Sequence, residues 1–152
     1  MTSMSETGAF HIVVGVDGSD PSLTALEWAI VEAKLRGADL TIITTWSYPI
    51  MAGTPGDIVP EDSFKQVCER IQADALKAAS DSGLTATGRI VRGSAVTVLL
   101  DAAQTADLLV VGSRGHGGFT GLLVGSVSNQ LVHHAACPVL VIRSKRTPQR
   151  QR

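Results

Sequence analysis

The chain has 152 residues, which suits a single domain and excludes a tandem pair of domains of ordinary size. Hydrophobic residues make up 44% and charged residues 18%, so the chain has enough apolar material for a core and too little charge for disorder. The formal charge of -1 gives no overall electrostatic field for nucleic acid or for an anionic membrane.

The cysteine and aromatic contents narrow the class of protein further. Cys68 and Cys137 are too few for a disulfide scaffold and match no paired metal-binding spacing. The first ten residues show no secretory signal, and no apolar run approaches the ~18 residues of a membrane span. Aromatic residues are only 4%, which leaves little material for stacking single-stranded nucleic acid. We therefore expect a soluble cytoplasmic protein with reduced thiols and without a nucleic-acid or membrane partner.

Short apolar runs alternate with segments of helical periodicity along the chain. Each run has the length of a strand, and the runs cover residues 12–16, 40–46, 85–91, 108–111 and 139–142. Several are continuously apolar, which is typical of a parallel sheet buried on both faces. The alternation predicts an α/β fold with five strands and four intervening helices.

Cap residues set the helix limits. The first helix is expected to begin at Asp20-Pro21, with Asp20 as N-cap, and to end at Gly37. The spacing of Phe64, Val67, Ile71 and Ala75 predicts a second helix that ends near residues 82–83. A third is expected behind Ser94. A fourth should cover residues 126–136.

Two segments depart from this alternation of predicted strands and helices. Residues 47–60 contain three prolines and two glycines, so they are predicted to be irregular, either as a cover over a site or as a plain connection. Residues 144–152 form a basic, proline-interrupted tail that we expect to be disordered. With a flexible N-terminus over residues 1–10, this leaves one domain over residues 11–143.

The sequence VVGSRGHGGFTGLLVGSVSNQLV carries the clearest chemical signal. An apolar strand runs into a glycine-rich loop and then into a helix, which is an arrangement that binds phosphate. Glycine lets main-chain N–H groups approach an anion closely, and the helix start adds free N–H groups and a positive dipole end. Two common phosphate motifs fail here, because the loop has no lysine for a P-loop and Thr120 stands where G-x-G-x-x-G needs its third glycine.

The spacing that does fit is G-x-x-G-x9-G-[ST], with Gly112, Gly115, Gly125 and Ser126 in place. With this motif the chain resembles the ATP-binding branch of the universal stress protein family, from VVGVDGSDPS near the start to CPVLVIR near the end. The resemblance implies an open five-stranded parallel sheet in the order 3-2-1-4-5 with helices on both faces, a Rossmann-like fold similar to that of the adenine nucleotide alpha hydrolases. In that order a ligand crevice opens between the first and fourth strands.

The resemblance also implies roles for particular residues. Asp17 would contact the ribose, with a turn aspartate in DGSD as the alternative interpretation. Val111 and Thr45 would line the adenine, and Trp46 departs from the small aliphatic residue expected nearby. For Arg114 a phosphate contact and a solvated loop position stay open. The nucleotide-binding residues expected are Gly15, Val16, Asp17, Thr45, Val111, Gly112, Arg114, Gly115, Gly125, Ser126, Val127 and Ser128, with no catalytic residue and no metal ligand.

The function implied is that of a regulatory module in the stress response that binds ATP, with or without Mg²⁺, and acts through an unidentified protein partner. The loop offers no lysine and no clear base for phosphoryl transfer, so hydrolysis is expected to be absent or slow. A slow ATPase and a binder of AMP or cyclic AMP remain as alternatives. The uncharged run at residues 139–142 would be an exposed sheet edge, so we also expect a homodimer through the last strand.

Overall fold

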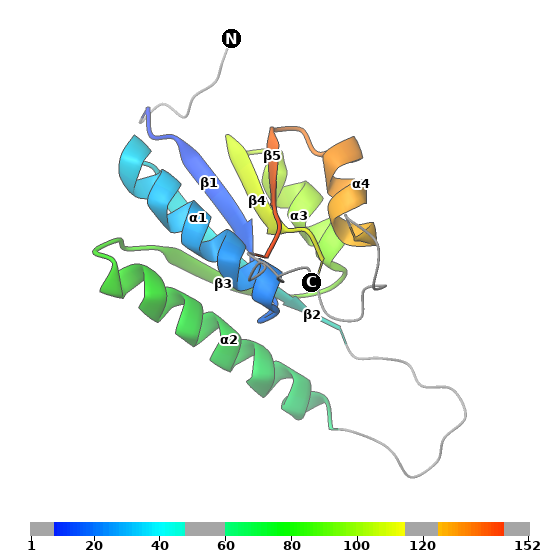
Figure 1. The fold of residues 1–152 in the computed structure, drawn as a ribbon. Helices are drawn as coiled ribbons and strands as arrows, with labels where there is room; N and C mark the ends of the chain where they lie inside the picture. Colours follow the sequence, from blue (N-terminus) through cyan, green and yellow to red (C-terminus); the bar gives the residue numbers. More distant parts are fainter. Residues whose placement is uncertain (1–7, 48–59, 115–124, 145–152) are drawn as a thin grey trace, which may run out of the picture.

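A computed structural model describes residues 8–47, 60–114 and 125–144 of the chain (Figure 1). Strands and helices alternate strictly in these residues, as the apolar runs predict. The elements are β1 (His11–Gly15), α1 (Asp20–Arg36), β2 (Asp39–Trp46), α2 (Glu61–Asp81), β3 (Thr87–Arg92), α3 (Ala95–Ala103), β4 (Leu108–Gly112), α4 (Ser126–His134) and β5 (Val139–Ile142).

The strands form a single parallel sheet in the order β3-β2-β1-β4-β5 within the described residues, which confirms the expected order. β1 lies at the centre, where Val14 pairs with Ile42 of β2 on one side and with Val110 of β4 on the other. After β1 the chain forms β2 and β3 on one side of β1, and it then crosses over to form β4 and β5 on the other side. The carboxyl ends of β1 and β4 therefore border the crevice in which ligands of open α/β sheets bind.

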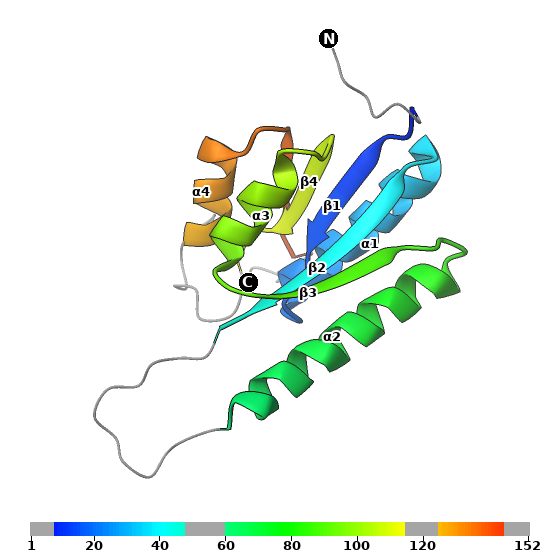
Figure 2. The same cartoon turned by 180° about the vertical axis from the view of Figure 1, so that it is seen from behind.

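Helices cover both faces of the sheet. Ile12, Val14 and Ile42 face α1 and α2 in one buried cluster, whereas Val13 and Ile43 face α3 and α4 in the other. Figure 2 shows α3 and α4 on the face opposite α1 and α2. This two-sided burial explains the continuously apolar strand sequences, since successive side chains enter different cores.

The first helix begins one residue earlier than expected. Ser19 is the N-cap, and its Oγ accepts from the Ser22 backbone N–H at 3.4 Å, so the expectation that Asp20 caps this helix is wrong. Asp20 is instead the first helical residue, where its negative charge faces the positive end of the helix dipole. The expected cap at Ser94 is confirmed by its bond with the Thr97 N–H.

Strand and helix limits shift by one or two residues elsewhere. β3 covers residues 87–92 rather than 85–91, because its pairing with β2 starts only at Thr87 and runs on to Arg92. The Gly93 N–H, which donates to the Trp46 carbonyl at 2.8 Å, prolongs this pairing. The fourth helix ends at His134 rather than 136.

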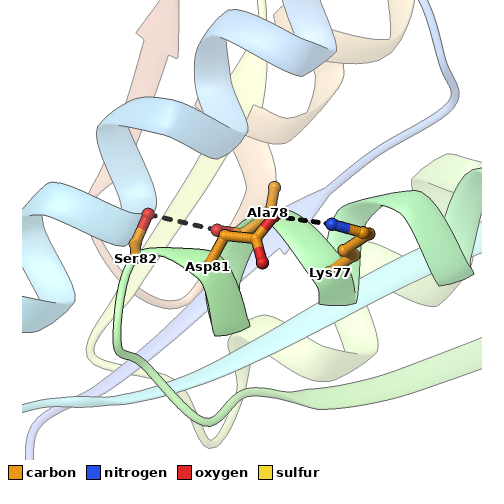
Figure 3. Close-up of polar contacts among 4 residues, drawn as sticks. All are labelled: Lys77, Ala78, Asp81 and Ser82. Atoms are coloured by element: carbon orange, nitrogen blue, oxygen red, sulfur yellow. Dashed lines mark hydrogen bonds and ion pairs between the residues drawn. The ribbon is translucent and has the colours of Figure 1, made fainter.

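α2 is fixed at its carboxyl end by polar contacts. Lys77 Nζ lies 2.9 Å from Asp81 Oδ2, and the Ser82 hydroxyl donates to the Ala78 carbonyl at 3.1 Å (Figure 3). Lys34 Nζ of α1 donates to the Ser82 carbonyl at 2.6 Å. α1 and α2 are thus tied together at the end remote from the carboxyl edge of the sheet.

No helix among the described residues is long and apolar enough to span a membrane.

Candidate functional site

A cavity of about 790 Å³ lies at the carboxyl edge of the sheet. Gly15, Thr45 and Gly112, at the ends of β1, β2 and β4, all line it. Every predicted site residue lines this cavity apart from Gly115, which lies outside the described residues: Gly15, Val16, Asp17, Thr45, Val111, Gly112, Arg114, Gly125, Ser126, Val127 and Ser128. Residues far apart in sequence are thereby brought to one site.

Asp17 follows β1 directly and holds the turn that leads into α1. Its Oδ1 accepts from the Ser19 backbone N–H at 2.9 Å and from the Ser19 hydroxyl at 2.5 Å. The Asp17 N–H in turn donates to the Ser22 hydroxyl at 3.2 Å. The turn interpretation and the cavity position therefore both hold for this carboxylate, and the turn bonds fix its orientation at the cavity wall.

α4 presents its amino end to the cavity. Gly125 is the N-cap and has no side chain to accept from the first N–H groups, whereas Ser19 and Ser94 cap α1 and α3 with their hydroxyls. The Gly125 N–H donates to the Ser113 carbonyl at 2.6 Å. The Ser128 hydroxyl donates to the Gly112 carbonyl, also at 2.6 Å. These bonds hold the uncapped, electropositive helix start against the end of β4.

Close packing explains the glycines at two strand ends. A Cβ on Gly112 would lie 2.6 Å from the Pro21 carbonyl carbon, and one on Gly15 would lie 2.9 Å from Leu99 Cδ1. Helices α1 and α3 therefore approach the strand ends as closely as they do because these positions lack a side chain. The sequence motif marks Gly112 for a ligand, and the structure adds a packing requirement at the same position.

The Thr45 carbonyl points toward the crevice beyond β1. The Ile43 carbonyl accepts from the Val16 N–H at 2.9 Å, and carbonyls two residues apart on a strand point to the same side. The Thr45 carbonyl therefore points to the same side of β2 as the Ile43 carbonyl, which is the side of β1. Because β1 ends at Gly15, no residue of β1 lies opposite Thr45. Its described contact is the Cys68 thiol at 3.8 Å, a long bond from a weak donor. This carbonyl can therefore accept a stronger hydrogen bond from a ligand.

The amino-terminal half of α2 forms a wall that the sequence motif did not indicate. Phe64, Val67, Cys68 and Ile71 line the cavity from this helix, beside Thr45 and Trp46 of β2. We call these six residues the α2 end of the cavity. The spacing of Phe64, Val67 and Ile71 predicts a helix from the sequence, but it does not indicate a cavity wall. Val67 is 57% exposed. Further lining residues outside the motif are Ser22, Ile43, Ser47, Ser63, Ala95 and Leu99.

Charge in the cavity is sparse. Among the described lining residues the charged side chains are Asp17 and Arg114. Burial raises the pKa of the Cys68 thiol, so this cysteine stays protonated at neutral pH and serves as a weak donor rather than as a nucleophile. The described residues contain no cluster of three or more His, Cys, Asp or Glu side chains suited to a metal ion. The cavity therefore combines an electropositive helix start with a largely apolar interior.

The chain is similar to known proteins of one family. The model of the universal stress protein family matches residues 9–143. The universal stress protein Rv1996 of Mycobacterium tuberculosis is 35% identical over 91% of this chain, which spans about half the length of that relative. The universal stress protein Rv2623 of the same organism is also 35% identical, over 90% of this chain and 46% of its own length.

Solved structures of universal stress proteins have the same fold as this chain. The universal stress protein UspA from Lactobacillus plantarum superposes with a TM-score of 0.70 at 26% identity, covering 88% of this chain and 97% of its own. A universal stress protein solved in complex with cAMP gives a TM-score of 0.69 at 31% identity, covering 90% of this chain and 98% of its own. The chain belongs to the universal stress protein family.

Proposed function

We propose that this chain binds ATP in the cavity between β1 and β4 and works as a nucleotide-dependent regulatory module in the cytoplasm, acting through a protein partner. The observation that carries the proposal is the uncapped start of α4, which faces the same cavity as Asp17 and the Thr45 carbonyl. These features supply the three chemistries that a nucleotide requires: an anion site, an acceptor for hydroxyl groups and an acceptor for a base.

The phosphates would bind at the start of α4. Backbone N–H groups of a first helical turn and the positive dipole end favour an anion strongly when no side chain occupies them. Ser126, Val127 and Ser128 supply these N–H groups, and Arg114 lines the cavity nearby. The Ser128 hydroxyl donates to Gly112, so it supports the helix start rather than the ligand.

The base would bind at the α2 end of the cavity. The Thr45 carbonyl can accept from the exocyclic amine of adenine but would oppose the carbonyl oxygen that guanine carries at the same ring position. Asp17 lies between the two ends on the turn after β1, where a carboxylate can accept from ribose hydroxyls. The polarity of the cavity thus matches an adenine nucleotide with its phosphates at α4.

Titration calorimetry of nucleotide-free protein tests this proposal. We expect ATP to bind and GTP to bind about 5- to 150-fold more weakly, because an unpaired carbonyl facing another oxygen costs on the order of 1–3 kcal/mol. The absence of binding heat for ATP, together with an unchanged unfolding temperature in its presence, would contradict the proposal. Equal affinity for ATP and GTP would remove the Thr45 carbonyl from base recognition.

Cyclic AMP is a second candidate ligand, because the similar structure at 31% identity was solved in complex with cAMP. The same base contact would serve either ligand. The two differ in that cAMP keeps only its 2′-hydroxyl as a donor to Asp17, because its 3′ oxygen is part of the cyclic phosphate, and in the number of phosphates at α4. A higher affinity for cAMP than for ATP in the same titration would favour this alternative. Steady phosphate release from ATP with Mg²⁺ would instead favour a slow ATPase.

The two cysteines offer an independent measure of cavity occupancy. Cys68 lines the cavity, whereas Cys137 packs beside the α3–α4 core away from it. Burial raises the pKa of both thiols, so both should alkylate more slowly at pH 8 than a free cysteine and react faster as the pH rises. We expect saturating ATP to slow the alkylation of Cys68 several-fold and to leave that of Cys137 unchanged, as read by mass spectrometry of peptides. Equal protection of both thiols would contradict local occupancy.

We further propose a homodimer through β5, which forms an edge of the sheet. The Pro138 carbonyl accepts from the Leu109 N–H of β4, and the Ile142 carbonyl accepts from the Ser113 N–H just after it. Backbone groups alternate along a strand, so those of Val139 and Val141 point to the open edge. A second copy can pair with these groups about a two-fold axis.

Replacing Val141 by proline tests the dimer. This change removes one N–H from the open edge and leaves the described bonds from β4 to β5 in place. We expect Val141→Pro to stay folded by circular dichroism and to shift toward monomer in light scattering. A monomeric wild type at micromolar concentration would contradict the proposal, as would a folded variant that remains fully dimeric.

A further inference from the structure

Trp46 is a lining residue of the cavity that the family resemblance did not lead us to expect. It follows Thr45 at the end of β2 and lies at the α2 end of the cavity. The Trp46 carbonyl accepts from the Gly93 N–H at 2.8 Å, so the backbone of this residue is anchored to the end of β3. The indole is therefore attached to a strand residue whose backbone is hydrogen-bonded within the sheet.

Arg92 holds the indole from one face. Its guanidinium carbon lies 5.2 Å from the Trp46 ring centroid, a cation–π distance. Arg92 Nη1 also lies 2.8 Å from Glu61 Oε1 on the first turn of α2. Because Trp46 and Arg92 are register partners on adjacent strands, the contact is built into the strand pairing. Because Arg92 occupies one face of the ring, a ligand would have to contact the other face or an edge.

An indole at this place fits a flat aromatic ligand. Purine bases stack on aromatic side chains, and the adjacent Thr45 carbonyl offers an acceptor at the edge of the same region. We infer that Trp46 stacks on the base of the bound nucleotide, with Arg92 on its far face. The inference rests on the proposed nucleotide binding and adds to it a base-contacting residue and a direct optical signal for the bound base.

The optical signal can be isolated, because Trp28 and Trp46 are the two tryptophans of the chain. Trp28 lies on α1, is 50% exposed and does not line the cavity. In a Trp28→Phe protein the tryptophan emission comes from Trp46 alone. We expect ATP to change this emission saturably, with the midpoint that calorimetry gives. Inorganic triphosphate, which has no base, should leave the emission unchanged at every concentration.

Replacement of the ring measures its contribution to binding. Stacking on one aromatic side chain predicts that Trp46→Leu weakens ATP binding by about 5- to 100-fold, and that Trp46→Phe recovers most of the loss. Stacking tolerates any base, so Trp46→Leu should weaken ATP and GTP by similar factors and keep their ratio. The matched change Trp28→Leu, outside the cavity, should leave both affinities as in the wild type.

The outcomes separate the two proposals. A Trp46→Leu protein that binds ATP as tightly as the wild type would overturn the stacking contact and leave nucleotide binding intact. A Trp28→Phe protein that binds ATP with no change in its tryptophan emission would do the same. If the wild type binds no adenine nucleotide in calorimetry, the proposed function and the contact fail together. Should Trp46→Leu fold poorly, the emission titration of the Trp28→Phe protein with ATP and with inorganic triphosphate still decides the question.

Discussion

Asp17→Ala is expected to weaken ATP binding by about 10- to 100-fold, as measured by calorimetry. The carboxylate lines the cavity after β1, and the bonds from Ser19 to Oδ1 orient it there. Hydrogen bonds to a charged group contribute roughly 1.5–3 kcal/mol, and each 1.4 kcal/mol is tenfold in affinity. Losing the acceptor for the ribose hydroxyls should therefore dominate the effect.

Ser19→Ala is the matched control, because it disturbs the same turn and keeps both the carboxylate and the bond that it accepts from the backbone N–H of residue 19. This change removes the hydroxyl that donates to Asp17 and that caps α1. We expect a loss of about 1 kcal/mol in the free energy of unfolding, as for other lost N-caps, and little change in ATP affinity. If Ser19→Ala weakened binding as much as Asp17→Ala, the turn rather than a ribose contact would explain both results.

Gly112→Ala is expected to reduce stability severely. The added Cβ would lie 2.6 Å from the Pro21 carbonyl carbon and 2.8 Å from its oxygen, and this backbone begins α1. Overpacking against backbone costs about 3 kcal/mol. For a domain of this size that lowers the unfolding midpoint by roughly 6–12 °C, which calorimetric melting can measure.

Gly88→Ala provides the comparison for that variant. A Cβ at Gly88 would lie 2.9 Å from Leu76 Cδ1 and 3.2 Å from Gln72 Cδ, which are atoms near the ends of flexible side chains. The Leu76 side chain can shift, and the Gln72 amide, which donates to the Ile42 and Arg89 carbonyls, must give by only a few tenths of an ångström. The loss of stability should therefore be smaller than at Gly112, where the added Cβ meets backbone. Equal melting of the Gly112→Ala protein and the wild type would show that the close approach of α1 to β4 is not required.

Local signals in the sequence predicted most of the fold. The apolar runs had strand length, and their uninterrupted character reflected burial by helices on both faces, as the alternation of Ile12, Val13 and Val14 between two cores shows. The error at the first helix arose because Ser19 and Asp20 are both good N-cap residues. The choice depends on which side chain reaches the Ser22 N–H, and a linear sequence does not show this.

Only part of the candidate site could be predicted from the sequence. The glycine spacing and Asp17 marked the ends of β1 and β4, because close approach and phosphate binding need particular residue types. The wall formed by Phe64, Val67 and Cys68 was not predicted, since an apolar face of α2 looks the same whether it packs on a sheet or lines a cavity. Trp46 stood out as a departure from the family pattern, but its contact with Arg92 depends on the strand register.

A crystal structure of the protein with ATP would test the central claim most directly. The account predicts the adenine between the Trp46 ring and the Thr45 carbonyl, the ribose at Asp17, and the phosphates against the N–H groups that begin α4. ATP bound outside this cavity, or bound within it with the phosphates at the α2 end and the base at Gly125, would contradict the account.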